Sequence, residues 1–168
     1  MGDYLKLTAG VPADVNANNA SAGAADAGKM VKLDAAGKLD GTLMPVGVGA
    51  ETRVFTTSEV LAAGDLVNIW NSTGAKVRKA DATTAGKEAH GFVLTSATNG
   101  GTVTVYPEEY VLSGMAALVP GTRMFLTTTA GLNSATPPSA AGQVVQDIGV
   151  ALSATEILFR PRQPITLV

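Results

Sequence analysis

The chain has 168 residues and a formal net charge of -2, which suits one domain, or one domain with an extension. The near-neutral charge argues against a nucleic-acid-binding protein, because such proteins usually carry a basic face. The sequence contains no cysteine, which excludes disulfides and thiolate metal sites. No apolar run approaches the roughly 20 residues that span a bilayer, and the first residues do not form a secretory signal. We therefore expect a protein made in a cytoplasm, with no membrane or nucleic acid as partner.

Residues 1–50 have the composition of an arm. They are rich in Ala, Gly, Asn and Asp, and residues 15–28 contain almost no side chain that could be buried. Such a segment cannot offset the cost of about 1–2 kcal/mol per residue for ordering its backbone. We therefore expect an extended N-terminal arm that becomes ordered against neighbours.

Two pieces of the arm carry a stronger pattern. Tyr4–Leu7 and Lys29–Asp34 alternate in part between apolar and polar residues, which indicates short strands. Pro45 with the glycines Gly47 and Gly49 is typical of a hinge. Such a linker usually lies at a domain boundary, so we predict that a second domain starts directly after it.

Residues 51–168 form a series of short strands separated by turn signals. Turns at about 8–12-residue spacing are typical of a β-sandwich or a barrel. We therefore predict a mainly β domain of sandwich or barrel-like type. The expected strands are Thr52–Thr57, Leu66–Trp70, Lys76–Lys79, Gly91–Ser96, Thr102–Tyr106, Tyr110–Leu112, Arg123–Thr127, Val144–Leu152, Glu156–Arg160 and Ile165–Val168.

Two local signals inside this domain are more specific. Asn99 and Gly100 form the strongest hairpin signal of the chain. Thr57 and Ser58 could cap a short helix over Glu59–Ala63, and Gly64 could end that helix.

A reactive centre cannot be assembled from the sequence. His90 is the single histidine, and no nucleophile, acidic partner or metal co-ligand forms a recognisable set around it. The adjacent Glu108 and Glu109 would point to opposite faces of a strand, so we expect a solvated turn rather than an acid–base pair. Asp34 and Asp40 lack the acidic pattern of a calcium loop. We expect no enzymatic activity, no cofactor and no metal.

Two stretches resemble phage virion proteins. The segment GKMVKLDAAGKLDGTLMP at residues 28–45 resembles a segment that recurs in phage decoration and fibre proteins. A second group is similar, in order and spacing, to a small β domain of phage head-decoration and fibre or tail proteins. This group comprises Ala63–Val67, Val77–Ala80, His90–Val93, Pro120–Leu126, Gly131–Leu132, Gln146–Gly149 and Ala151–Phe159.

The resemblance covers most of the chain and implies both a fold and a role. The implied fold is a small β-sandwich or barrel-like (β-tulip-type) domain. The implied role is that of a homotrimeric capsid decoration, or cement, protein on the outer surface of a phage head. Its partners would be the major capsid protein, its own copies and neighbouring decoration subunits, and no catalytic residue is implied.

The apolar residues of the arm are the candidate contact residues. We expect them to touch the capsid or a neighbouring subunit, although Met30–Met44 could instead pack on its own domain. These residues are Tyr4, Leu5, Leu7, Met30, Val31, Leu33, Leu39, Leu43 and Met44.

Other functions remain as alternatives. A tail-fibre or head-fibre component would usually need a long shaft of repeats, which this chain lacks. A carbohydrate-binding β module would usually present aromatic side chains for stacking, whereas aromatics make up only 5% of this sequence. The expected location is therefore the outer surface of the virion capsid.

Overall fold

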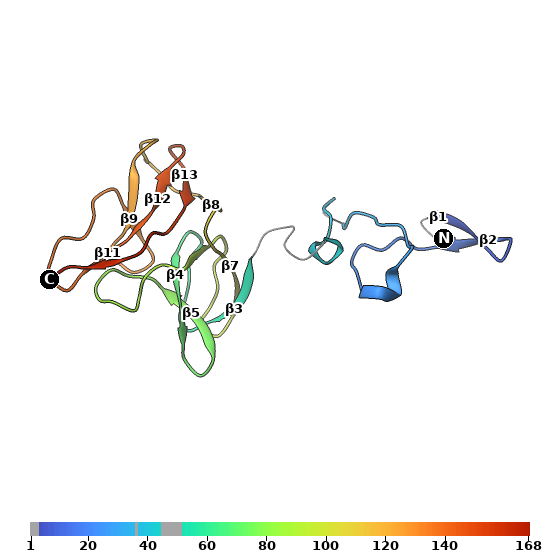
Figure 1. The fold of residues 1–168 in the computed structure, drawn as a ribbon, viewed down its shortest axis with the longest axis horizontal. Helices are drawn as coiled ribbons and strands as arrows, with labels where there is room; N and C mark the ends of the chain where they lie inside the picture. Colours follow the sequence, from blue (N-terminus) through green and yellow to red (C-terminus); the bar gives the residue numbers. More distant parts are fainter. Residues whose placement is uncertain (1–3, 36, 45–51) are drawn as a thin grey trace. The chain divides into compact units, whose positions relative to one another are not determined.

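The computed structural model describes residues 4–35, 37–44 and 52–168. The chain divides into two compact units, Met1–Ala50 and Glu51–Val168. We call them the N-terminal unit and the barrel unit (Figure 1).

The N-terminal unit begins with a tight β-hairpin. Strands β1 (Tyr4–Thr8) and β2 (Val11–Val15) pair antiparallel, and Ala9 and Gly10 connect them with φ values of 53° and 83°. Two positive φ angles are typical of the type I′ turn, whose twist matches that of a hairpin. The strand expected at Tyr4–Leu7 is confirmed. The second strand was not predicted, because Pro12 weakens its strand signal.

The rest of the described N-terminal unit contains two short 3₁₀ turns, η1 (Gly23–Asp26) and η2 (Gly41–Leu43). The strand predicted at Lys29–Asp34 is wrong, because only Val31 forms a bridge, in parallel with Asn18. The small polar residues around Asn18 lead into η1 instead of continuing as a partner strand, so no ladder can extend. The predicted hinge at Pro45, Gly47 and Gly49 lies outside the described residues.

A closed barrel forms the first half of the barrel unit. Its strand order is β3-β5-β4-β6-β7, with β3 parallel to β5 and the other pairs antiparallel. Closure leaves no unpaired sheet edge. The predicted fold class, mainly β with a barrel-like domain, is confirmed. The strands are β3 (Arg53–Thr57), β4 (Leu66–Asn71), β5 (Ala75–Lys79), β6 (Gly91–Val93) and β7 (Thr102–Tyr106).

An antiparallel sheet forms the second half, in the order β10-β9-β12-β13-β8. A two-stranded ribbon of β11 and β14 lies at the C-terminal end of the chain (Figure 1). These strands are β8 (Val111–Ser113), β9 (Arg123–Leu126), β10 (Asn133–Ser134), β11 (Val144–Val145), β12 (Asp147–Ala151), β13 (Glu156–Phe159) and β14 (Ile165–Thr166).

Strand β6 and the first half of β4 join the two halves because both of their faces are buried there. Val67 and Val93 point into the barrel, whereas their neighbours Leu66 and Phe92 belong to the cluster shared with the second sheet. The Phe92 ring lies 5.4 Å from the ring of Phe159 in β13, in an edge-to-face arrangement. Alternation along a strand thus lets two adjacent side chains serve two different cores.

Two predictions for this unit are wrong. The helix expected at Glu59–Ala63 does not form, because Leu61 is fully buried against the barrel core and pairs with Ala97 in a β-bridge. The single strand expected at Val144–Leu152 is split at Gln146, whose buried side chain bonds to both backbone groups of Ala89. The short strand β10 was not predicted.

Candidate interaction surface

The N-terminal unit presents its apolar side chains to solvent. Leu5 and Leu7 in β1 are 71% and 69% exposed, and no residue of this unit whose burial is described is buried. Large apolar groups left in water are a source of association energy, at about 25 cal/mol for each Å² that a partner covers. Of the predicted contact residues, Leu5, Leu7, Met30, Val31, Leu33, Leu39 and Met44 are exposed, and Tyr4 and Leu43 are half-buried.

The hairpin sorts its side chains between two faces. Leu5 lies opposite Asp14, and Leu7 lies opposite Pro12, so both leucines share one face. Tyr4 belongs to the other face. A two-stranded hairpin is marginally stable in water by itself, and it gains stability when a partner covers its apolar face.

The remaining predicted contact residues lie on turns held by polar groups. The Met30 N–H donates to the Tyr4 hydroxyl at 3.5 Å, which links β1 to this segment. Leu33 and Leu39 flank a turn that is closed by a pair of bonds: the Asp34 N–H donates to the Lys38 carbonyl, and the Lys38 N–H donates to the Asp34 carboxylate, each at 2.8 Å. The structure therefore places the two leucines on either side of the hydrogen-bonded pair Asp34 and Lys38.

Two further carboxylates hold this unit together. Hydrogen bonds from the Lys29 ammonium, 2.8 Å from Asp26, and from the Ala22 N–H lower the pKa of Asp26 to about 2. Hydrogen bonds from the hydroxyl and N–H of Thr42 also lower the pKa of Asp40. Charged turns thus order the unit in place of an apolar core.

One exposed apolar residue of the hairpin was not predicted. Val11 starts β2 and is 64% exposed. Gly10 in front of it was the available signal, because a Gly after Leu7 and Thr8 favours a turn and hence a returning strand.

His90 has a structural role in the barrel unit. Its N–H donates to the Val67 carbonyl at 2.8 Å, and its Nδ1 accepts the Ile69 N–H at 3.0 Å. The imidazole thereby continues the pairing of β4 with β6 beyond Gly91. Because Nδ1 accepts a hydrogen bond, the geometry assigns the ring proton to Nε2.

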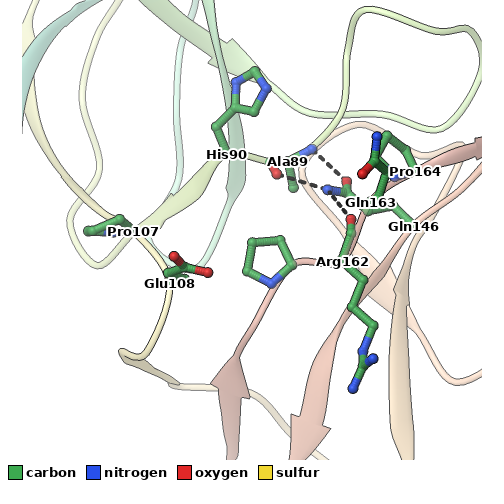
Figure 2. Close-up of a pocket in the computed structure, with 9 residues that line it drawn as sticks. Ala89, His90, Pro107, Glu108, Gln146, Arg162, Gln163 and Pro164 are labelled. Atoms are coloured by element: carbon green, nitrogen blue, oxygen red, sulfur yellow. Dashed lines mark hydrogen bonds between the residues drawn. The ribbon is translucent and has the colours of Figure 1, made fainter.

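His90 also lines a pocket of ≈ 400 Å³ next to the C-terminal segment (Figure 2). Glu108 and Arg162 line the same pocket, whereas Glu109 turns to Arg160, whose guanidinium donates to its carboxylate at 2.7 Å. The two glutamates occupy a turn and have separate environments. In the described part of the chain, no group of three or more His, Asp or Glu side chains is placed to hold a metal ion.

Searches for similar proteins give no assignment. Neither a protein-family model nor a curated protein sequence matches this chain. Among the described residues, no helix is long and apolar enough to cross a membrane.

Proposed function

We propose that this chain is a non-enzymatic structural subunit of a phage particle. It is a homotrimeric decoration, or cement, protein that binds the outer surface of the capsid and stabilises the junctions between capsomers. The observation that carries the proposal is the contrast between a barrel unit with a complete core and an N-terminal unit whose apolar side chains face solvent. The two sequence stretches that resemble decoration proteins support the phage context.

A decoration protein acts by binding an assembled lattice. Because it binds the closed shell and not loose subunits, it stabilises the shell by mass action. A trimer multiplies each weak contact through effective concentration. Long-lived attachment can therefore be built from small apolar contacts.

The N-terminal unit supplies those contacts. Leu5 and Leu7 form an apolar stripe on the hairpin, and its outer strand edges can extend an exposed sheet edge of the major capsid protein or of a neighbouring decoration subunit. Leu33, Leu39 and Met44 add further apolar surface along the same unit.

Shells that lack the protein provide the direct test. Purified protein is added to expanded shells, which are then imaged and heated. We expect regular density at symmetry axes and a higher disruption temperature. Shells that show no regular density would reject the decoration role.

Matched surface variants assign the contact region. We expect removal of residues 1–50, or the pair Leu5→Ser and Leu7→Ser, to weaken shell binding while the barrel unit stays folded. The control pair Val60→Ser and Leu132→Ser removes similarly exposed apolar groups from the barrel unit, and it should leave binding unchanged. If the two double variants bind shells equally well, the contact does not lie on the hairpin.

A further inference from the structure

The two ends of the barrel differ in how well side chains cover the interior. At one end Leu61 is fully buried on the core and pairs with Ala97, which closes the interior. At the other end Phe55 and Ile69 pack on the same core but remain partly exposed. A pocket of ≈ 240 Å³ opens there, and we call it the mouth pocket. It is lined by Arg53, Phe55, Ile69, His90, Val105 and Pro107.

The mouth pocket is lined both by apolar side chains and by two side chains that can donate hydrogen bonds, Arg53 and His90. Among the described residues Arg53 has no ion pair, and His90 carries its ring proton on Nε2 because its Nδ1 accepts the Ile69 N–H. Pro107 also belongs to the neighbouring pocket, in which Glu108 adds a negative charge (Figure 2). This arrangement fits an apolar side chain that has a carboxylate on one side and a cation on the other.

The N-terminal unit carries that pattern in three consecutive residues, Lys38, Leu39 and Asp40. Leu39 is 45% exposed. The Oδ1 atom of Asp40 accepts the Thr42 N–H at 2.9 Å, which fixes the local backbone, while Oδ2 has no hydrogen-bond partner in the described part of the chain. A turn that is already ordered loses little conformational freedom on binding.

We propose that Leu39 of one copy docks into the mouth pocket of a second copy. Asp40 then pairs with Arg53 and with the His90 Nε2–H, and Lys38 approaches Glu108. The contact deepens the proposed function and rests on it in one respect, namely that copies of this chain associate with one another. Each copy offers one turn and one pocket, so the contact is head-to-tail and can close into a ring.

A charge exchange tests the pairing without any shell. Self-association of the full chain is measured by sedimentation. Either Arg53→Glu or Asp40→Arg should weaken it roughly tenfold, and the chain that carries both changes should recover it. The tripeptide Lys32–Asp34 has the same sequence as Lys38–Asp40, so Leu33→Ala is a matched control for Leu39→Ala. Equal weakening by both alanine variants, or no recovery in the double variant, would overturn the docking.

Disulfide trapping identifies the copy that supplies the turn. Because the chain has no cysteine, single cysteines can be introduced without background. Chains with Leu39→Cys and longer, tagged chains with Pro107→Cys are mixed and mildly oxidised. We expect a mixed disulfide dimer, and much less product when Leu33→Cys replaces Leu39→Cys. A bond that forms only when both cysteines are in the same chain would overturn docking between copies.

The two proposals fail in distinguishable ways. Self-association that depends on Leu39 and Arg53, together with no binding to shells, would reject the decoration role and keep the docking. Shell binding by a chain whose self-association does not respond to Arg53→Glu or Asp40→Arg would reject the docking and keep the decoration role.

Discussion

Leucine and valine form buried clusters in the barrel unit but none in the described part of the N-terminal unit. In the barrel unit Leu66 and Val67 are fully buried, and each faces a different core. In the N-terminal unit Leu5 and Leu7 lie two residues apart on β1, and both face solvent. The difference lies in the neighbouring strands: β4 has a strand on each side and a second sheet behind it, whereas among the described residues β1 pairs only with β2. Apolar side chains on a strand are therefore buried in a core only where neighbouring strands and a second sheet cover them.

The two units also differ in what fixes their backbones. The barrel unit is ordered by strand ladders around apolar clusters, and the N-terminal unit by carboxylates such as Asp26 and Asp40 at the start of short turns. Substitutions in the barrel unit should consequently change the free energy of unfolding. Substitutions of exposed apolar residues in the N-terminal unit should change association instead.

The largest effect is expected at Gly149 in β12. Its φ is +139°, and an added Cβ would lie 1.9 Å from the Leu158 carbonyl oxygen. Gly149→Ala should therefore cost more than about 4 kcal/mol or prevent folding. Gly142→Ala is the control, because that glycine also has a positive φ but open space around it, and it should cost only about 1 kcal/mol. Urea unfolding compares the two, and equal costs would contradict the steric argument.

The second effect concerns the residue that joins the two halves of the barrel unit. Phe92 is fully buried and packs against the rings of Tyr106 and Phe159, so Phe92→Ala should cost about 3–5 kcal/mol. Leu39→Ala in the N-terminal unit should change the unfolding free energy by less than about 0.5 kcal/mol. A cost at Leu39 comparable to that at Phe92 would show that the N-terminal unit has a core of its own.

The third effect tests the polar link that splits the strand expected at Val144–Leu152. Gln146→Leu leaves the N–H and carbonyl of Ala89 without their partners, at 2.8 and 3.0 Å, and should cost about 1–3 kcal/mol. Gln143 also accepts backbone N–H groups, but it is less buried, so Gln143→Leu should cost less. Thermal unfolding of both variants checks the order, and a reversed order would contradict it.

The smallest expected effect is that of Asp81→Asn on the stability of the barrel unit in acid. Burial raises the pKa of the Asp81 carboxyl, but hydrogen bonds from Thr83 and Lys87 outweigh burial and hold it below its usual value. A lowered pKa in the folded state stabilises the protein above the unfolded pKa of about 3.9, and this contribution is lost as the pH falls through the folded value. Urea unfolding of the barrel unit between neutral and acid pH should show a smaller acid loss for Asp81→Asn.

The N-terminal unit supplies the control for this pH dependence. The pKa of Asp26 is also lowered, but Asp26 belongs to the N-terminal unit. Asp26→Asn should therefore leave the acid dependence of the barrel unit unchanged. A similar change in both variants would show that the units unfold together.

The mainly β fold could be predicted because its signals are local. Alternation of apolar and polar residues, together with turn residues, marked most strands of the barrel unit. Asn99 and Gly100 lie in a turn, in which the Gly101 N–H donates to the Thr98 carbonyl at 2.9 Å. The helix prediction failed because the burial of Leu61 depends on a bridge to Ala97, which no local pattern reveals.

The candidate sites differ in the same respect. The exposed apolar residues of the N-terminal unit could be predicted, because residues 15–28 offer nothing to cover them. The mouth pocket could not be predicted, because Arg53, His90 and Pro107 meet only when the barrel closes. The exposure of these apolar side chains could thus be predicted from the sequence, whereas the cavity could not.

The pairing of β3 has a consequence for the timing of folding. β3 is the first barrel strand in the chain, and it pairs with β7, the last one, so the ring closes through its most distant contact. Contacts between distant segments form slowly, because the intervening loop must first be ordered. During synthesis β3 can pair with β5 earlier, but the ring cannot close until β7 has left the ribosome, while the β1–β2 hairpin needs only its own residues. The segment that precedes the barrel can thus fold, and meet other chains, before the barrel exists.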